Sequence, residues 1–127
     1  MMTERRDSLS PSEQATIQEL LDSDRKQTTA RIAMLRSDLD EIASSSALTG
    51  ADDEHDPEGS STAFERAHAQ SLLDQALNHL GELDQAVERL RDGSYGICVK
   101  CGHRIPVERL LILPAARTCV LCAPRRR

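Results

Sequence analysis

Four cysteines near the C-terminus are the residues of this sequence whose type and spacing most clearly indicate chemistry. Cys98 and Cys101 form one CxxC pair, and Cys119 and Cys122 form a second pair after seventeen intervening residues. Zinc prefers four ligands at the corners of a tetrahedron, and a two-residue gap lets each pair supply one edge. A spacer of about 15 to 20 residues is typical of sites that close in this way. The pattern therefore predicts that these four cysteines bind one Zn²⁺ ion.

The predicted zinc is structural, because ligation by four cysteines leaves no open position for a reacting water molecule. A redox interpretation, with each CxxC acting as a dithiol, lacks the flanking βαβ pattern of thioredoxin-like proteins. His103 could replace one cysteine, although four cysteines already suffice. No nucleophile–base pair or phosphate-binding loop stands out in the rest of the chain. We therefore expect that the protein is not an enzyme.

Two long helices are predicted to precede the cysteines. Ser10 and Glu13 form a capping box around Pro11, which suits the first position of a helix. Apolar residues then recur at spacings of three or four, up to a serine run at 44–46. A second capping box, Thr62 with Glu65, opens the better heptad run, and Gly93 ends it. The apolar positions are Ile17, Leu21, Ile32, Leu35, Leu39 and Ile42 in the first helix and Leu73, Ala76, Leu80, Leu83, Val87 and Leu90 in the second.

The expected fold class is mainly α: an antiparallel two-helix coiled-coil hairpin with a small C-terminal four-cysteine zinc-finger module. The boundaries that follow are a disordered N-terminus over 1–9, a hairpin over 10–93 with an acidic tip loop over 47–61, a zinc finger over 94–122 and a basic tail over 123–127. Each amphipathic helix must bury its apolar stripe, and the other helix is the nearest partner. At about 1.5 Å per residue the hairpin is roughly 45 Å long. Pairing of the helices between two chains is the alternative to the expected monomer.

Composition limits the classes of protein to which this chain can belong. One Phe, one Tyr and no Trp argue against a conventional globular core, since large aromatic side chains dominate such cores. Residues 1–97 carry nine Lys and Arg against twenty Asp and Glu, a net charge of −11, whereas residues 98–127 carry seven against one, a net charge of +6. No stretch is long and apolar enough to cross a membrane, and no signal peptide is evident. We expect a cytoplasmic protein, and in that reducing compartment paired cysteines indicate metal binding rather than disulfides.

The sequence resembles the DksA/TraR family of bacterial C4 zinc-finger transcription regulators. The matching residues run from Tyr95-Gly96-x-Cys98-x-x-Cys101-Gly102, directly after a heptad helix, to Cys119-x-x-Cys122, with Ile105, Arg109, Leu110, Pro114 and Ala116 between them. The resemblance covers residues 62–122, and the first helix only by architecture. It implies binding to RNA polymerase, with the hairpin inserted through the secondary channel towards the catalytic centre. It also implies modulation of transcription initiation without catalysis.

The acidic loop is the part that the resemblance places at the tip of the hairpin. Family members carry two aspartates three residues apart, followed by an alanine two residues further on, and here Asp53 and Asp56 match the aspartates. Glu58 stands at the alanine position, and an alignment on Asp56 instead places Gly59 where the second aspartate belongs. We take Asp53 and Asp56 as the partner-binding tip residues. A loop that only joins two helices is the alternative.

Two further expectations concern ligands other than zinc. Some family members bind guanosine tetraphosphate through basic residues, but the corresponding positions here are Gln75, Glu82 and Ala123. We therefore predict no dependence on this nucleotide. We also expect no direct contact with nucleic acid, because the rest of the chain is acidic and offers few aromatic groups for base stacking. A nucleic-acid-binding zinc finger that uses its arginines, and a coiled-coil adaptor protein, remain the alternatives.

Overall fold

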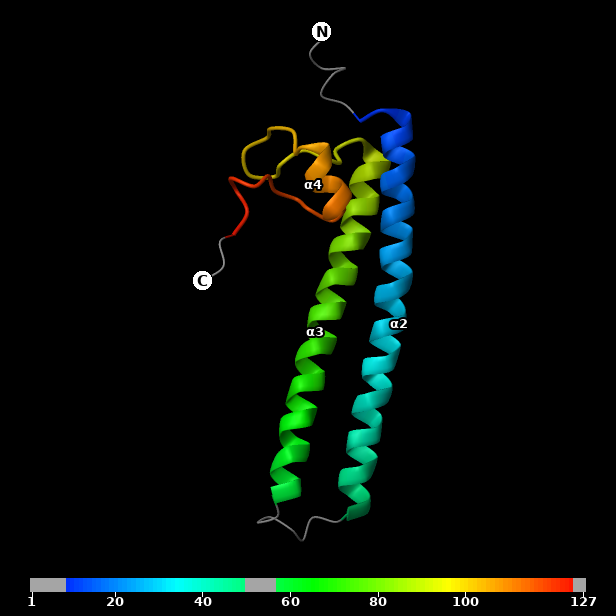
Figure 1. The fold of residues 1–127 in the computed structure, drawn as a ribbon, viewed down its shortest axis with the longest axis vertical. Helices are drawn as coiled ribbons and strands as arrows, with labels where there is room; N and C mark the ends of the chain where they lie inside the picture. Colours follow the sequence, from blue (N-terminus) through cyan, green and yellow to red (C-terminus); the bar gives the residue numbers. More distant parts are fainter. Residues whose placement is uncertain (1–8, 50–56, 125–127) are drawn as a thin grey trace. The chain divides into compact units, whose positions relative to one another are not determined.

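The described part of the chain, residues 9–49 and 57–124 of the computed structural model, is mainly helical. Helix α2 spans Pro11–Thr49, α3 spans Pro57–Asp92 and the short α4 spans Val107–Ile112 (Figure 1). Within those ranges no strand forms, and Ile97 and Arg104 make only an isolated antiparallel bridge. The expected fold class is confirmed.

The capping signals at two helix ends act as the sequence predicts. At the start of α2 the Glu13 N–H donates to Ser10 Oγ at 3.1 Å, and the Ser10 N–H donates to Glu13 Oε1 at 2.9 Å. At the end of α3, Gly93 has φ of +88°, which a residue without a Cβ adopts at no steric cost. The Ser94 N–H then donates back to the Arg89 carbonyl at 3.0 Å. This is the Schellman arrangement, which satisfies carbonyls that the helix itself leaves without partners.

The inner ends of the two long helices differ from the prediction. Helix α2 continues past the serine run at 44–46 to Thr49, and α3 already begins at Pro57, so residues 47–49 and 57–61 are helical rather than loop. Thr62 and Glu65 therefore lie inside α3 and do not start it. A serine costs only about 0.5 kcal/mol relative to alanine within a helix, so three of them do not stop one. Proline at the first position has its φ already set for a helix, which makes Pro57 the stronger start signal.

Two compact units make up the structure, and each has its own core. The first unit comprises Met1–Arg25 and Gly81–Arg127, and the second comprises Lys26–Leu80. The core of the first unit contains Ile17, Leu21, Leu83, Ala86, Tyr95, Cys98, Ile105 and Leu110. The core of the second contains Ile32, Leu35, Leu73 and Ala76. Leu9, assigned to a disordered N-terminus by the sequence, packs against the first core.

The two long helices run antiparallel within both units (Figure 1). In the first unit the early residues Ile17 and Leu21 of α2 share a core with the late residue Leu83 of α3. In the second unit the later residues of α2 share a core with earlier residues of α3. All twelve predicted heptad positions are buried or half-buried, and Thr28 is buried among the apolar positions of α2. None of the helices described here is long and apolar enough to span a membrane.

Replacing Gly81 of α3 by alanine is expected to stabilise the protein by about 0.5 to 1 kcal/mol. A Cβ added at Gly81 meets no atom within 4 Å, so alanine fits there, and glycine in a helix costs about this much in backbone entropy. Urea denaturation of the zinc-loaded protein measures the change. Gly93→Ala is the matched control, because the positive φ at that position makes the same substitution destabilising. Stabilisation by both substitutions, or by neither, would contradict this explanation.

Candidate metal centre

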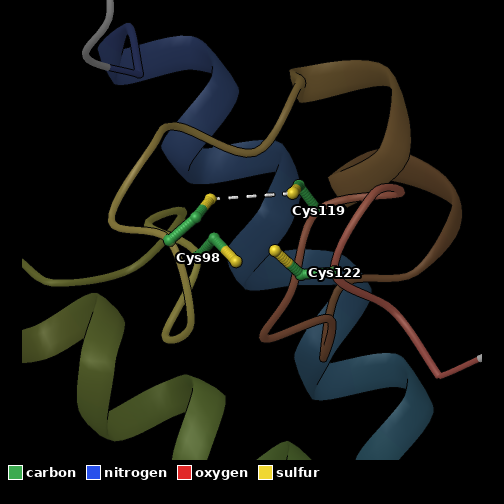
Figure 2. Close-up of side chains that lie close together, drawn as sticks. Cys98, Cys119 and Cys122 are labelled. Atoms are coloured by element: carbon green, nitrogen blue, oxygen red, sulfur yellow. Dashed lines mark hydrogen bonds between the residues drawn. The ribbon is translucent and has the colours of Figure 1, made fainter.

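The structure brings together all four cysteines that the sequence singles out as metal ligands. The sulfur atoms of Cys98, Cys101, Cys119 and Cys122 all lie within 4.8 Å of one another. Figure 2 shows Cys98, Cys119 and Cys122 directing their sulfurs towards one shared point. Cys98 is fully buried, Cys119 and Cys122 are half-buried, and Cys101 is exposed. One pair approaches from the loop after α3 and the other from the segment after α4.

The spacing of the sulfurs fits a tetrahedral zinc ion. The Cys101 and Cys119 sulfurs are 3.8 Å apart. With a Zn–S bond of about 2.3 Å, the edge of a regular S₄ tetrahedron is also roughly 3.8 Å. The same distance is far longer than a disulfide bond, which is about 2.05 Å. Four soft sulfur donors at this separation match the preference of zinc, and they fill all four positions of a structural site.

Backbone hydrogen bonds shape both cysteine pairs. In the first pair the Cys98 N–H donates to the His103 carbonyl at 2.8 Å, and the Gly102 N–H donates to the Cys98 carbonyl at 2.9 Å. In the second pair the Cys122 N–H donates to the Cys119 carbonyl at 3.1 Å. These tight turns place both sulfurs of each pair on the same side. The cysteines are thus held by local backbone geometry before any metal is considered.

Two long-range contacts fix the segment that carries the second pair. The Tyr95 hydroxyl donates to the Pro114 carbonyl at 2.7 Å. Arg109, on α4, donates from Nε to the Thr118 carbonyl at 3.0 Å, one residue before Cys119. Tyr95 is buried, so the loss of this hydrogen bond would leave polar atoms without partners at a cost of about 1 to 3 kcal/mol. The two side chains therefore act as positioning residues for the second cysteine pair.

The zinc-finger segment and the helix ends of the first unit share one hydrophobic core. Cys98, Ile105 and Leu110 are buried in the same cluster as Leu83 of α3, and Cys119 and Cys122 pack against it. The apolar stretch at 105–114 contributes to this core only in part. Leu111 and Ile112 are exposed, because α4 is a single short helix with only one face towards the core, and Leu113, which follows the helix, is exposed as well.

The local environment lowers the pKa of some of the cysteine thiols and raises that of others. Burial acts to raise the pKa of Cys98, but backbone N–H groups, foremost those of Cys101 and Cys119, lower it to about 6. The pKa of Cys119 is also lowered, chiefly by the Cys122 backbone N–H. The pKa of Cys122 is raised to about 12 by its hydrogen bond with the Cys119 sulfur and by burial. Four adjacent thiolates repel one another, so a cation is needed before all of them can ionise.

Zinc binding is therefore expected to release protons and to strengthen as the pH rises. Only thiolates ligate zinc, and the metal-free site retains the Cys122 proton because its pKa is about 12. As the pH falls below about 6, Cys98 also becomes protonated, so zinc affinity should fall more steeply there. Competition against a chromophoric chelator across this pH range measures the dependence. A zinc affinity that does not change with pH would show that the ligands are not these thiols.

The other predicted site residues lie outside the described structure. Asp53 and Asp56, the expected tip residues, fall in the range 50–56 between α2 and α3, which is not described. The same holds for the three terminal arginines of the basic tail. The positioning role of Tyr95 and Arg109 was not predicted from the sequence. Both stand in the motif around the cysteines, but only the fold shows which carbonyl each side chain reaches.

Comparison with known proteins identifies the C-terminal segment. Residues 93–127 match the model of a family described as "Prokaryotic dksA/traR C4-type zinc finger". The chain is 42% identical over 60 residues to an uncharacterized protein of Aquifex aeolicus (strain VF5), a match that covers 44% of this chain and 41% of that protein. It is 33% identical over 73 residues to General stress protein 16O of Bacillus subtilis (strain 168), and this match covers 58% of this chain and 45% of that protein. The chain thus spans less than half the length of both curated relatives.

A solved structure resembles most of the fold. It is that of transcription factor DksA2 from Pseudomonas aeruginosa, with a TM-score of 0.72 and 27% sequence identity, and the match covers 88% of this chain and 81% of that one. The resemblance to the DksA/TraR family that the cysteine motif indicated is confirmed by these findings. The four clustered cysteines agree with a C4-type finger that holds one structural zinc ion.

Proposed function

We propose that this chain, whose residues 93–127 are a dksA/traR C4-type zinc finger, is a bacterial transcription regulator that binds RNA polymerase and catalyses no reaction itself. The observation that carries this proposal is the likeness to transcription factor DksA2, which extends over both long helices as well as the finger. We further propose that the protein acts in the cytoplasm as a monomer. Its helices already find their partners within one chain, so the fold does not require a second copy.

In this proposal the zinc ion is held by Cys98, Cys101, Cys119 and Cys122 and has a structural role. When bound, it supplies a cross-link between two segments that the chain itself joins only through α4. Protein side chains position the rest of the finger. Tyr95 and Arg109 hold the segment before the second pair, and Leu83 of α3 packs in the same core as Cys98. The finger is thereby seated on the ends of α2 and α3 within the first unit.

The finer part of the proposal concerns the connection between α2 and α3. It is shorter than the sequence indicated, since α2 ends at Thr49 and α3 begins at Pro57. We propose that this connection enters the secondary channel of the polymerase and that Asp53 and Asp56 are its functional side chains. Carboxylates favour hard cations such as Mg²⁺, so these aspartates are suited to the metal of a polymerase catalytic centre or to basic residues around it.

Replacement of residues 51–56 by a Gly-Ser segment of equal length is expected to weaken binding to core RNA polymerase by at least about tenfold, or roughly 1.4 kcal/mol. The replacement leaves the sequences of both helices and the zinc finger unchanged. The control replaces four exposed carboxylates of α2, Glu19, Asp38, Asp40 and Glu41, by the corresponding amides, which removes the same number of negative charges outside the tip. Fluorescence anisotropy with labelled protein gives the affinities.

Two outcomes of this experiment would change the proposal in different ways. Equal affinities for the intact protein and the tip variant would reject insertion of the tip while leaving polymerase binding in place. No binding by the intact protein at modest ionic strength would reject the polymerase as partner. In that case the exposed Lys100, Arg104 and Arg117 of the finger make nucleic acid the next ligand to test.

A further inference from the structure

The two CxxC turns present apolar side chains to solvent. Val99 stands between the cysteines of the first pair and is 61% exposed, while Val120 and Leu121 stand between those of the second pair and are 66% and 94% exposed. Among the described residues, six of the nine exposed large apolar side chains lie in the range 99–121. Single exposed apolar residues are normal on a protein surface, whereas a concentration of them indicates a binding surface.

The two turns are neighbours on the finger. The Val99 N–H donates to the Arg117 carbonyl at 2.9 Å, which ties the first turn to the segment that leads into the second. Val120 follows Arg117 by three residues, and a fully extended chain of that length spans about 11 Å at most. The sulfurs of both pairs also converge on one point (Figure 2). Val99, Lys100, Arg117, Val120 and Leu121 therefore form one small surface, which we call the knuckle surface.

The charge of the knuckle surface is positive. Lys100 and Arg117 are both exposed, and Glu108 is the single acidic residue of the sequence after Cys98. Residues 98–127 carry a net side-chain charge of +6, and a Zn²⁺ ion with four thiolates contributes a formal −2, so the finger retains +4. Opposite charges on two surfaces favour their association. The knuckle surface is thus suited to a partner surface that is both apolar and acidic.

The chemistry of this surface favours a protein over a nucleic acid. Its valines and leucine are aliphatic, and single-stranded nucleic acids are bound by aromatic side chains on which the bases stack. We propose that the knuckle surface docks on an acidic and apolar segment of the protein partner. This inference rests on the proposed function, in which the partner is RNA polymerase, and it adds a contact separate from the tip. Backbone hydrogen bonds already hold both turns, so docking costs little conformational entropy.

The test compares Val120→Ser with Leu121→Ser, made together in one chain, against Ile112→Ser. Ile112 lies on α4 in the same unit and is 77% exposed, so it controls for the loss of an apolar side chain outside the knuckle surface. The double substitution is expected to weaken binding to core RNA polymerase at least about tenfold, because buried apolar anchors carry much of an interface's binding energy. Ile112→Ser should weaken binding by no more than about twofold. Both variants should retain one zinc per chain, since no ligand is changed.

A second variant tests the charges of the knuckle surface. Lys100→Gln with Arg117→Gln is expected to weaken polymerase binding at least about threefold at low ionic strength, and less as salt screens the attraction. It changes no apolar side chain and no zinc ligand, so it also decides the matter if the double serine variant loses its zinc.

Several outcomes would overturn the inference. Unchanged polymerase binding by a zinc-loaded double serine variant would show that the partner does not use this surface, and so would an equal loss in Ile112→Ser. A dimer of the unchanged protein that becomes a monomer in the double serine variant would assign the surface to a second copy. Weaker binding of labelled single-stranded DNA, with polymerase binding unchanged, would assign it to nucleic acid. If the unchanged protein fails to bind polymerase, the proposed function itself fails, and the partner named here fails with it.

Discussion

Cys119→Ser is expected to abolish stable zinc binding and to unfold residues 94–124, while most of the helical content remains. Serine does not ionise near neutral pH and is a poor zinc ligand, so only three of the four sulfurs remain. The binding free energy of structural zinc in small modules is about 10 to 16 kcal/mol, which equals or exceeds the whole stability of a typical domain. A segment whose only helix has six residues cannot compensate for such a loss.

The measurement combines zinc content with circular dichroism. Helices α2 and α3 have 39 and 36 residues, so unfolding of α4 removes only a small part of the helical signal. Val120→Ser is the matched control, because Val120 lies between Cys119 and Cys122 and its side chain is exposed. It should retain one zinc per chain. Full zinc occupancy in Cys119→Ser would contradict the assignment of this ligand, and wholesale loss of helix would show that the hairpin depends on the metal.

Leu83→Ala is expected to lower the free energy of unfolding by about 2 to 5 kcal/mol. Leu83 has no exposed surface, and it packs in the core that α2, α3 and the zinc-finger segment share. The substitution therefore leaves a cavity in the same core as Cys98. We expect the loss to appear in urea denaturation at a fixed concentration of free zinc, since a ligand that binds the folded state stabilises it by mass action.

The control for this substitution is Leu77→Ala on the same helix. The Leu77 side chain is 38% exposed and belongs to neither core, so its loss should cost less than about 1 kcal/mol. Comparable losses in the two variants would mean that the shared core around Leu83 contributes no more than ordinary helix surface. A large loss confined to Leu83→Ala would support seating of the finger on the helix ends.

Features that depend on neighbouring residues could be predicted from the amino-acid sequence alone. The capping box of Ser10 and Glu13 and the left-handed Gly93 each act over a few residues, so their outcome follows from local patterns. The heptad positions were also predictable, because a helix of regular period places them on one face. The two CxxC pairs indicated a zinc site because the chemistry of four thiolates leaves few other uses for that spacing.

Local sequence signals predicted the inner ends of α2 and α3 incorrectly, because each signal is weak compared with the packing that favours a longer helix. The serine run at 44–46 and the apparent capping box at Thr62 both indicated helix ends, yet α2 and α3 continue through them. Each of these signals is worth only about 1 kcal/mol or less. A helix whose apolar face is already packed therefore continues through such weak signals and ends only where a residue disfavours the helix more strongly.

The way in which the zinc finger is built into the rest of the chain became visible only in the folded structure. The boundary predicted at residue 94 divides a single core, because Leu9 and Ile17 pack together with Tyr95 and Leu110. Neither the burial of particular apolar residues after Ile105 nor the buried Nη2 atom of Arg89, which lacks a hydrogen-bond partner, followed from the sequence. These features depend on contacts between segments many residues apart. Their side chains meet only when the antiparallel helices bring the two ends of the chain to one core, and no local pattern encodes that meeting.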